Sequence, residues 1–185
     1  MLPATDTSIA DPDMPDTDDH WVEKVRQGDT AAFETLYRRH GGRVFALCLR
    51  LSANRAVAEE LTQETFIRAW QQIGKFRGDS RFGTWLYRIA ANLTLSQLRT
   101  RKPESGCDWI DELAGETALA GHSDHQRDLE RGMSGLPDGA RSVLVLHDIA
   151  GFAHKEIGDM LGVATGTCKA QLHRARKLMR EYLDS

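Results

Sequence analysis

Residues 154–183 read HKEIGDMLGVATGTCKAQLHRARKLMREYL, and this stretch decides the fold of the C-terminal part of the chain. Its apolar spacing predicts one helix over residues 154–161 and a second helix over residues 165–182. The three residues between them, Gly162-Val163-Ala164, read as a tight turn. The pattern therefore predicts a closely joined pair of helices at this end of the chain.

Three positions within this pair have the spacing of a helix-turn-helix. Gly158 places a minimal side chain where the two helices would cross, and Gly162 allows the positive φ of a tight turn. Cys168 falls on the inner side of the second helix, where a cysteine behaves as a small hydrophobic residue rather than as a redox sensor. This combination of small residue, turn glycine and inner apolar residue predicts a helix-turn-helix.

The second predicted helix has an apolar face and a cationic face. Its packed stripe comprises Cys168, Leu172, Ala175, Met179 and Tyr182. Its opposite side carries Lys169, His173, Arg176 and Arg180, widened by Arg174 and Lys177. Such a helix can place Lys and Arg against phosphates and base edges in a major groove. We predict DNA binding, with an amphipathic terminal helix of ordinary surface charge as the alternative.

The rest of the chain also has helical periodicity and no convincing strand alternation. The predicted upstream helices span residues 20–27, 30–51, 52 or 54 to 73, and 82–101, with a loop at 74–81 and a stop at Pro103. A further helix begins after Pro137 and ends at Gly151. The predicted fold class is all-α, with two small helical domains joined by a flexible acidic linker and a helix-turn-helix in the second domain.

Charge is segregated along the chain, although the net charge is only −3. Residues 1–20 hold six acids and no bases, residues 21–102 hold 15 bases and seven acids, and residues 103–126 hold six acids and no bases. Basic blocks attract a polyanion, and solvated helix faces are the alternative explanation. The predicted boundaries are an acidic disordered tail (1–19), a first domain (20–102), an acidic linker (103–126) and a second domain (127–185).

The sequence shows no signature of catalysis, metal binding or membrane insertion. It has no phosphate-cradling glycine loop and no plausible nucleophile-base pairing, and its three cysteines form no CxxC pair. His122 and His125 have a metal-like spacing without further ligands nearby, so we interpret them as part of a solvated loop. No apolar run reaches about 18 residues, and the N-terminus lacks a signal-peptide pattern. We expect a cytoplasmic protein that needs no cofactor and is not an enzyme.

Aromatic and basic residues are mixed over residues 75–88, KFRGDSRFGTWLYR. This mixture suits single-stranded nucleic acid, because bases stack on rings while Arg and Lys follow the phosphate backbone. The alternative is a set of core aromatics with surface charge, and Phe82 and Trp85 fit that alternative. Phe76 precedes the predicted loop and is harder to assign to the core.

Several stretches resemble one known family. AEELTQETFIRAW (58–70), KFRGDS (75–80) and TWLYRIAAN (84–92) closely resemble the second conserved region of the extracytoplasmic-function group of bacterial sigma factors. LP (136–137), EIG (156–158), LG (161–162), GT (166–167) and LHRAR (172–176) resemble the fourth region of the same group. The resemblance implies an alternative-type, stress-response sigma factor that binds core RNA polymerase and directs promoter-specific transcription initiation.

The resemblance also implies roles for individual residues. Docking on the clamp helices of the polymerase largest subunit would use Glu60, Gln63, Glu64 and Trp70, and the second domain would meet the β-subunit flap. Reading of the melted −10 element would use Phe76, Arg77, Ser80, Arg88, Ile89 and Asn92, with Phe76, Ile89 and Asn92 lining a pocket for a flipped base. Reading of the −35 element would use Lys169, Ala170, Gln171, His173, Arg174 and Lys177.

Two departures from the family pattern bear on promoter choice. Many relatives carry Ser and Arg where this chain has Ala170 and Gln171, so this chain offers a different set of hydrogen-bonding groups to the −35 element. His154 and Lys155 replace a more usual aromatic and acidic pattern before the turn. We therefore expect an unusual −35 sequence preference.

The family further implies an anti-sigma protein that covers the polymerase-binding and DNA-binding surfaces. From the charge segregation we also hypothesise that the acidic tail and linker fold back on the basic blocks and weaken DNA binding by the free protein. One alternative is a stand-alone helix-turn-helix repressor, which would bind symmetric duplex sites as a dimer without polymerase. The other is an adaptor that binds polymerase but not DNA.

Overall fold

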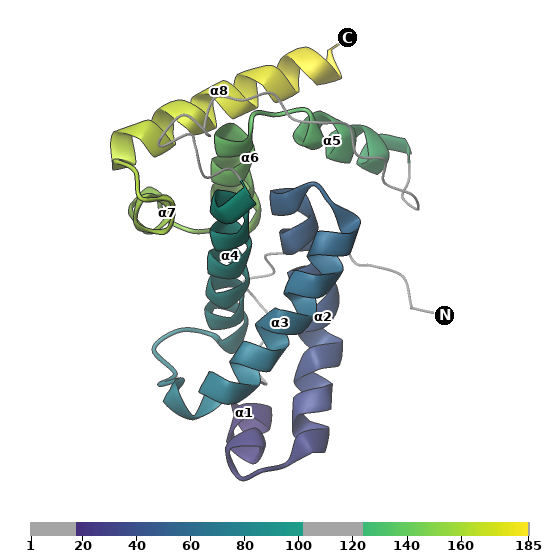
Figure 1. Cartoon of the computed structure of the whole chain (residues 1–185), viewed down its shortest axis with the longest axis vertical. Helices are drawn as coiled ribbons and strands as arrows, with labels where there is room; N and C mark the ends of the chain where they lie inside the picture. The colour runs from purple at the N-terminus through teal and green to yellow at the C-terminus, as the bar shows by residue number, and fades with distance from the viewer. Residues whose placement is uncertain (1–17, 102–123, 185) are drawn as a thin grey trace.

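The computed structural model describes residues 18–101 and 124–184, and every regular element within these residues is helical (Figure 1). The N-terminal elements are α1 (Asp18–Arg26), α2 (Thr30–Ser52), α3 (Arg55–Gln72), the 3₁₀ turn η1 (Ile73–Lys75) and α4 (Phe82–Arg101). The C-terminal elements are α5 (Asp124–Ser134), α6 (Asp138–Leu144), its π-helical continuation η3 (Val145–Ile149), α7 (His154–Leu161) and α8 (Thr165–Leu183). The predicted all-α fold is thus confirmed for this part of the chain.

Side-chain caps set where the long helices begin. Asp29 accepts hydrogen bonds from two backbone N–H groups in the first turn of α2, at 2.9 and 3.1 Å. Asn54 accepts one from the N–H of Val57 at 3.1 Å and so caps α3. Between the two helices, Ala53 adopts a left-handed backbone with φ of 50° and ends α2. Of the two starts predicted for the third helix, Ser52 and Asn54, the structure selects Asn54.

Helices α1 to α4 pack around a common apolar core. Figure 1 shows α2 and α3 side by side, with α1 at one end of the pair. The largest fully buried side chains of these helices are Leu36, Val44, Leu47, Leu51, Phe82, Leu86 and Leu95. Burial of each such side chain contributes roughly 1.5–3 kcal/mol. This core fixes α3 against α4, the two helices that carry most of the residues predicted to contact polymerase and the −10 element.

The predicted helix-turn-helix is confirmed at α7 and α8. Gly162 has a φ of 71°, and the Val163 N–H donates a 3.0 Å hydrogen bond to the carbonyl of Gly158. A Cβ added at Gly158 would lie 2.8 Å from the Val163 carbonyl oxygen and 3.8 Å from Cys168 Sγ. The chain therefore needs a minimal side chain at this crossing, as the spacing predicted.

The packed stripe of α8 is shorter than predicted. Cys168, Leu172, Ala175 and Met179 are buried, but Tyr182 is 43% exposed. Tyr182 lies in the last turn of α8, and its ring lies against Gly132 of α5. The prediction that Tyr182 belongs to the packed stripe was therefore wrong.

Among the residues that the structure describes, three polar contacts join the N-terminal and C-terminal helices. Arg50 of α2 pairs with Glu130 of α5, and Arg88 of α4 pairs with Glu156 of α7. Arg99 of α4 donates a 2.8 Å hydrogen bond to the carbonyl of Met160 in α7. In Figure 1, α8 lies across the end of the molecule formed by α5 and α6. At each of these contacts a basic residue of the first half meets an acceptor of the second, and α2 also packs against α5, α6 and η3.

Candidate functional site

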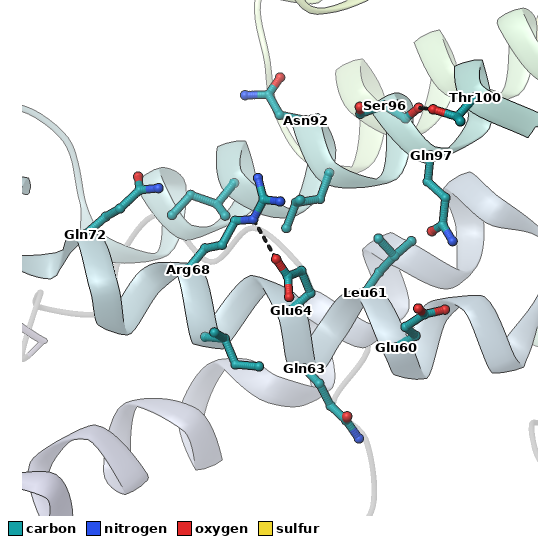
Figure 2. A pocket seen from close by; sticks show the side chains of 13 residues that line it. Glu60, Leu61, Gln63, Glu64, Arg68, Gln72, Asn92, Ser96, Gln97 and Thr100 are labelled. Atoms are coloured by element: carbon teal, nitrogen blue, oxygen red, sulfur yellow. Dashed lines mark hydrogen bonds and ion pairs between the residues drawn. The ribbon is translucent and has the colours of Figure 1, made fainter.

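A groove of about 760 Å³ lies between α3 and α4. Helix α3 contributes Glu60, Leu61, Gln63, Glu64, Ile67, Arg68 and Gln72. Helix α4 contributes Ile89, Asn92, Leu93, Ser96, Gln97 and Thr100. Three of the predicted polymerase-contact residues and two of the predicted −10 residues therefore line one continuous surface (Figure 2).

The α3 wall of this groove carries acidic and amide side chains that are open to a binding partner. Glu60 and Gln63 are exposed, and Gln63 extends away from α4 in Figure 2. Glu64 accepts a 2.7 Å hydrogen bond from Nε of Arg68, but both side chains are more than two-fifths exposed. An exposed pair of this kind contributes about 0.3–0.5 kcal/mol, so a basic partner can replace Arg68 at little cost.

Trp70 is not among the groove residues and lies in a cluster of aromatic rings from α2 and α3. It is 40% exposed, and its ring meets Phe33 edge-on at 4.9 Å between centroids. Phe33 also meets Phe66, which meets Tyr37, and Tyr37 is 44% exposed. Ile67, on the same helix as Trp70, is 52% exposed and lines the groove. Trp70 and Tyr37 therefore leave part of this aromatic cluster open to a partner molecule. The predicted docking residues are thus split between a polar groove and this aromatic cluster.

The α4 wall holds two of the predicted −10 residues, while the loop before it holds three others. Ile89 and Asn92 both line the groove, with Asn92 exposed. Arg77 is exposed and Ser80 is partly buried, in the short segment between η1 and α4. Phe76, however, is only 6% exposed.

The burial of Phe76 settles its place in the core. Its ring lies 5.2 Å from that of Trp85 and 5.9 Å from that of Phe82, centroid to centroid. In this arrangement the ring offers no free face to an incoming base. Phe76 instead supports the loop and α4 from within, and base stacking on it would require the loop to move.

Arg88, another predicted −10 residue, is engaged by the C-terminal half. It pairs with Oε1 of Glu156, while Oε2 of the same carboxylate accepts a 2.9 Å hydrogen bond from the N–H of Ala153. Glu156 therefore caps α7 and holds Arg88 at once. The side chains are 46% and 36% exposed, so the pair is open to solvent and to competition.

Most predicted −35 residues lie on the outer face of α8. Lys169, Ala170, His173, Arg174 and Lys177 are exposed, and Gln171 is partly buried. The Oε1 atom of Gln171 is shielded from solvent without a hydrogen-bond partner among the described residues. The outer face therefore presents cations over most of its length, with a methyl group at Ala170.

Arg176 on the same helix is held by a neighbouring carboxylate. Its Nε and Nη2 atoms lie 2.9 and 2.6 Å from the two oxygens of Asp148 in η3. The Arg176 hydrogen bond holds the pKa of Asp148 below its usual value, with a further contribution from His147. Partial burial and the adjacent His147 lower the pKa of His154, whose ring lies 4.3 Å from that of His147. Arg176 is thus oriented before any DNA is bound.

Two contacts of α1 with distant parts of the first domain have no signal in the sequence. Asp18 of α1 lies 2.8 Å from Nε2 of His40, and both side chains are nearly inaccessible. Arg26, at the end of α1, donates hydrogen bonds to the carbonyls of Ile73 and Phe76. No local pattern could have found these contacts, because each joins residues at least 22 positions apart.

The described residues contain no group of three or more His, Cys, Asp or Glu side chains placed to hold a metal ion. The side chains of His122 and His125 lie outside the described part of the chain. Cys168 is fully buried, and burial raises the pKa of its thiol, in keeping with a packing role. Within the described part, no helix is long and apolar enough to span a bilayer.

Comparison with known sequences gives two family matches that fall on the two halves of the chain. The Sigma-70 region 2 family matches residues 36–104, and the Sigma-70 region 4 family matches residues 126–179. The ECF RNA polymerase sigma factor SigW of Bacillus subtilis is 34% identical over 178 residues, which cover 88% of this chain and 94% of the relative. The ECF RNA polymerase sigma factor SigE of Mycolicibacterium smegmatis is 36% identical, over 90% of this chain and 72% of the relative.

Comparison with solved structures gives the same fold. The sigma factor RpoE of Bartonella quintana, in complex with the anti-sigma factor NepR, aligns with a TM-score of 0.60 and 28% identity, over 82% of this chain and 96% of the other. CnrH, in complex with the cytosolic domain of CnrY, aligns with a TM-score of 0.58 and 23% identity, over 90% and 97% of the two chains. The second likeness supports the fold alone.

Proposed function

The chain belongs to the extracytoplasmic-function group of RNA polymerase sigma factors, and from this membership we propose which of its surfaces meet polymerase, promoter and inhibitor. Residues 20–102 form the region 2 domain, which binds core polymerase and reads the melted −10 element. Residues 127–185 form the region 4 domain, which reads the −35 duplex through α8 and meets the β-subunit flap. The predicted tail (1–19) and linker (103–126) each overlap a helix at their end, because α1 begins at Asp18 and α5 at Asp124, so we assign the acidic tail and linker to the residues before these two helices.

The observation that carries this proposal is the shared groove between α3 and α4. Glu60, Gln63 and Glu64 on one wall supply acceptors for a basic, polar surface on the clamp helices of the polymerase largest subunit. Ile89 and Asn92 on the other wall supply apolar contact and amide hydrogen bonding for an unpaired base. Polymerase docking and −10 reading therefore take place on adjoining surfaces of one rigid helix pair.

The −35 element is read by the outer face of α8. Lys169, Arg174 and Lys177 contact phosphates and base edges, and His173 extends the same face. Ala170 makes an apolar contact, which suits a thymine methyl group, and Gln171 suits adenine once its side chain turns outward. We infer a −35 preference richer in A·T pairs at these positions than that of relatives with Ser and Arg.

The closed arrangement of the two halves is incompatible with promoter binding. The −35 and −10 elements are centred about 25 bp apart, which is roughly 85 Å of duplex at about 3.4 Å per bp. Arg88 of the −10 set and Glu156 beside the −35 set are in direct contact in the closed chain. The interdomain contacts must therefore open before both elements are bound.

We infer that an anti-sigma protein stabilises such a closed chain. The Bartonella quintana relative is solved with its anti-sigma factor NepR, and this chain covers 96% of that relative. The exposed Tyr37 and Trp70 provide an apolar surface for such a partner. A protein that covers this surface also denies it to polymerase.

The test is reconstitution with sigma-free core RNA polymerase and a library of random promoter sequences. Opened promoters that depend on this protein, with enriched sequences near −35 and −10, are the expected result. Tight binding to symmetric duplex sites without polymerase would instead identify a repressor. Binding to core polymerase without opening any promoter would identify an adaptor. Either of these two results overturns the proposal.

A further inference from the structure

We propose that Arg26 is a positioning residue for the −10-reading loop, an inference that rests on the proposed function of that loop. Arg26 lies in the last turn of α1, and its side chain crosses to the start of the segment between η1 and α4. Its Nε donates to the carbonyl of Ile73 at 3.5 Å, and its Nη2 donates to the carbonyl of Phe76. One guanidinium thus joins α1 to both ends of the turn from which the loop departs.

The two carbonyls that Arg26 reaches lie where the 3₁₀ turn η1 begins and where it ends. The Ile73 carbonyl accepts the Phe76 N–H at 3.2 Å within the 3₁₀ turn, and the chain turns to extended geometry at Phe76, with φ of −66° and ψ of 118°. A cation near the last carbonyls of a helix also interacts favourably with the helix dipole. Arg26 therefore fixes the point where the chain leaves the helix.

The other end of the loop is held by a second contact from α1. Phe82, the first residue of α4, is fully buried, and its ring lies 5.5 Å from that of His40. His40 in turn pairs with Asp18 in the first turn of α1. The two ends of α1 thus support the two ends of the segment 77–81, Arg26 at its start and Asp18, through His40, at its finish.

Most of this segment is open to solvent. Arg77, Gly78 and Asp79 are exposed, and Gly78 adopts a φ of 79° that only glycine adopts readily. A short exposed loop keeps a defined course when its ends are fixed, and Arg26 binds the backbone of the start rather than any loop side chain. Removing Arg26 should loosen the loop while leaving the α3 surface for polymerase intact.

The experiment compares wild type with Arg26→Ala, Arg26→Lys, Arg26→Gln and the control Arg38→Ala. Arg38 is exposed on α2 and pairs with Glu34 at 2.6 Å, so its loss removes an arginine from the same domain without touching the loop. Four quantities are measured: thermal unfolding, affinity for core polymerase, holoenzyme binding to a single-stranded −10 oligonucleotide, and permanganate reactivity of unpaired thymines in a promoter.

We expect Arg26→Ala to lower −10 oligonucleotide binding and thymine reactivity by about tenfold, with core affinity within about twofold of wild type. Arg26→Lys and Arg26→Gln, which keep a donor, should recover part of the loss, and Arg38→Ala should match wild type. Equal losses of core affinity and −10 binding, tracking a lower melting temperature, would show a merely structural role and overturn the inference. Unchanged −10 binding would overturn it as well. If wild type itself opens no promoter, the proposed function fails instead.

Discussion

The guanidinium of Arg50 in α2 lies 3.0 Å through Nε and 2.8 Å through Nη2 from one carboxylate oxygen of Glu130 in α5. The side chains are 10% and 9% exposed, so this ion pair between the two halves of the chain is almost fully desolvated. Breaking a buried pair by removing one partner leaves an uncompensated charge. If Glu130 is removed, the charge of Arg50 can regain water only when the two halves separate. The substitution should therefore favour separation of the halves.

Glu130→Ala should therefore shift the chain toward the open arrangement. We expect the ratio of open to closed chains to rise on the order of tenfold, about 1.4 kcal/mol, because Arg50 is rehydrated only in the open form. Energy transfer between dyes placed on α3 and on the C-terminal end of α8 measures the change. Asp128→Ala is the control, since Asp128 lies on the same helix in an exposed 3.7 Å pair with Arg131. Indistinguishable transfer in the two variants would contradict the prediction.

Glu64→Ala should weaken binding to core polymerase, because it removes an acceptor from the centre of the groove. We expect a loss of about tenfold with unchanged binding to −35 duplex, since α8 is untouched. The chain offers a closely matched control in Glu34→Ala, which breaks a Glu–Arg pair of the same i, i+4 spacing, at 2.6 Å on α2 against 2.7 Å on α3. Equal affinities of the two variants for core polymerase would refute the assignment of Glu64.

Two substitutions on α8 should separate affinity from sequence choice. Lys177→Ala should weaken binding to all −35 sequences about equally and reduce the salt dependence of binding by about one unit of slope, as loss of one phosphate contact does. Gln171→Arg should instead change which −35 sequences are preferred, because arginine favours guanine. Binding measured across salt concentrations and a library of −35 duplexes tests both. A sequence-dependent effect of Lys177→Ala would assign Lys177 to base reading instead.

The Asp18–His40 pair should make stability depend on pH. Burial raises the pKa of Asp18, but the His40 hydrogen bond and the charges of His40, Arg39 and Arg43 outweigh burial and hold the pKa below its usual value. A carboxylate whose folded-state pKa is lowered stabilises the fold above its unfolded-state pKa, and this contribution is lost as the pH falls through the folded-state pKa.

Asp18→Asn should therefore be less stable than wild type near neutral pH by about 1–3 kcal/mol, and the gap should close in acid. Urea unfolding of both proteins across the acidic range measures the difference. Asp19→Asn is the control, because Asp19 is the adjacent carboxylate and is exposed. A constant difference between wild type and Asp18→Asn at every pH would show that the carboxylate charge contributes nothing.

Local patterns determined the elements that depend on neighbours along the chain. Helix periodicity predicted α4 over Phe82–Arg101 and α7 over His154–Leu161 as the structure has them, because an amphipathic helix records its buried side every three or four residues. The spacing of Gly158, Gly162 and Cys168 predicted the helix-turn-helix for a similar reason, since the three residues lie close together along the chain. Family resemblance then supplied the function that these elements perform.

Tertiary structure alone decided which residues of distant elements contact one another and which are buried. It buried Phe76 against Phe82 and Trp85, left Tyr182 exposed, and brought the α3 and α4 residues of the groove together. It also placed Arg26 on the loop and Arg50 on Glu130, contacts that span 50 and 80 positions. A charged side chain gives the same local signal whether it faces water or a distant carbonyl, because its partner is chosen by the packing of whole helices. The sequence therefore determined the helices and the family, and the packing of those helices determined which of their polar groups are engaged.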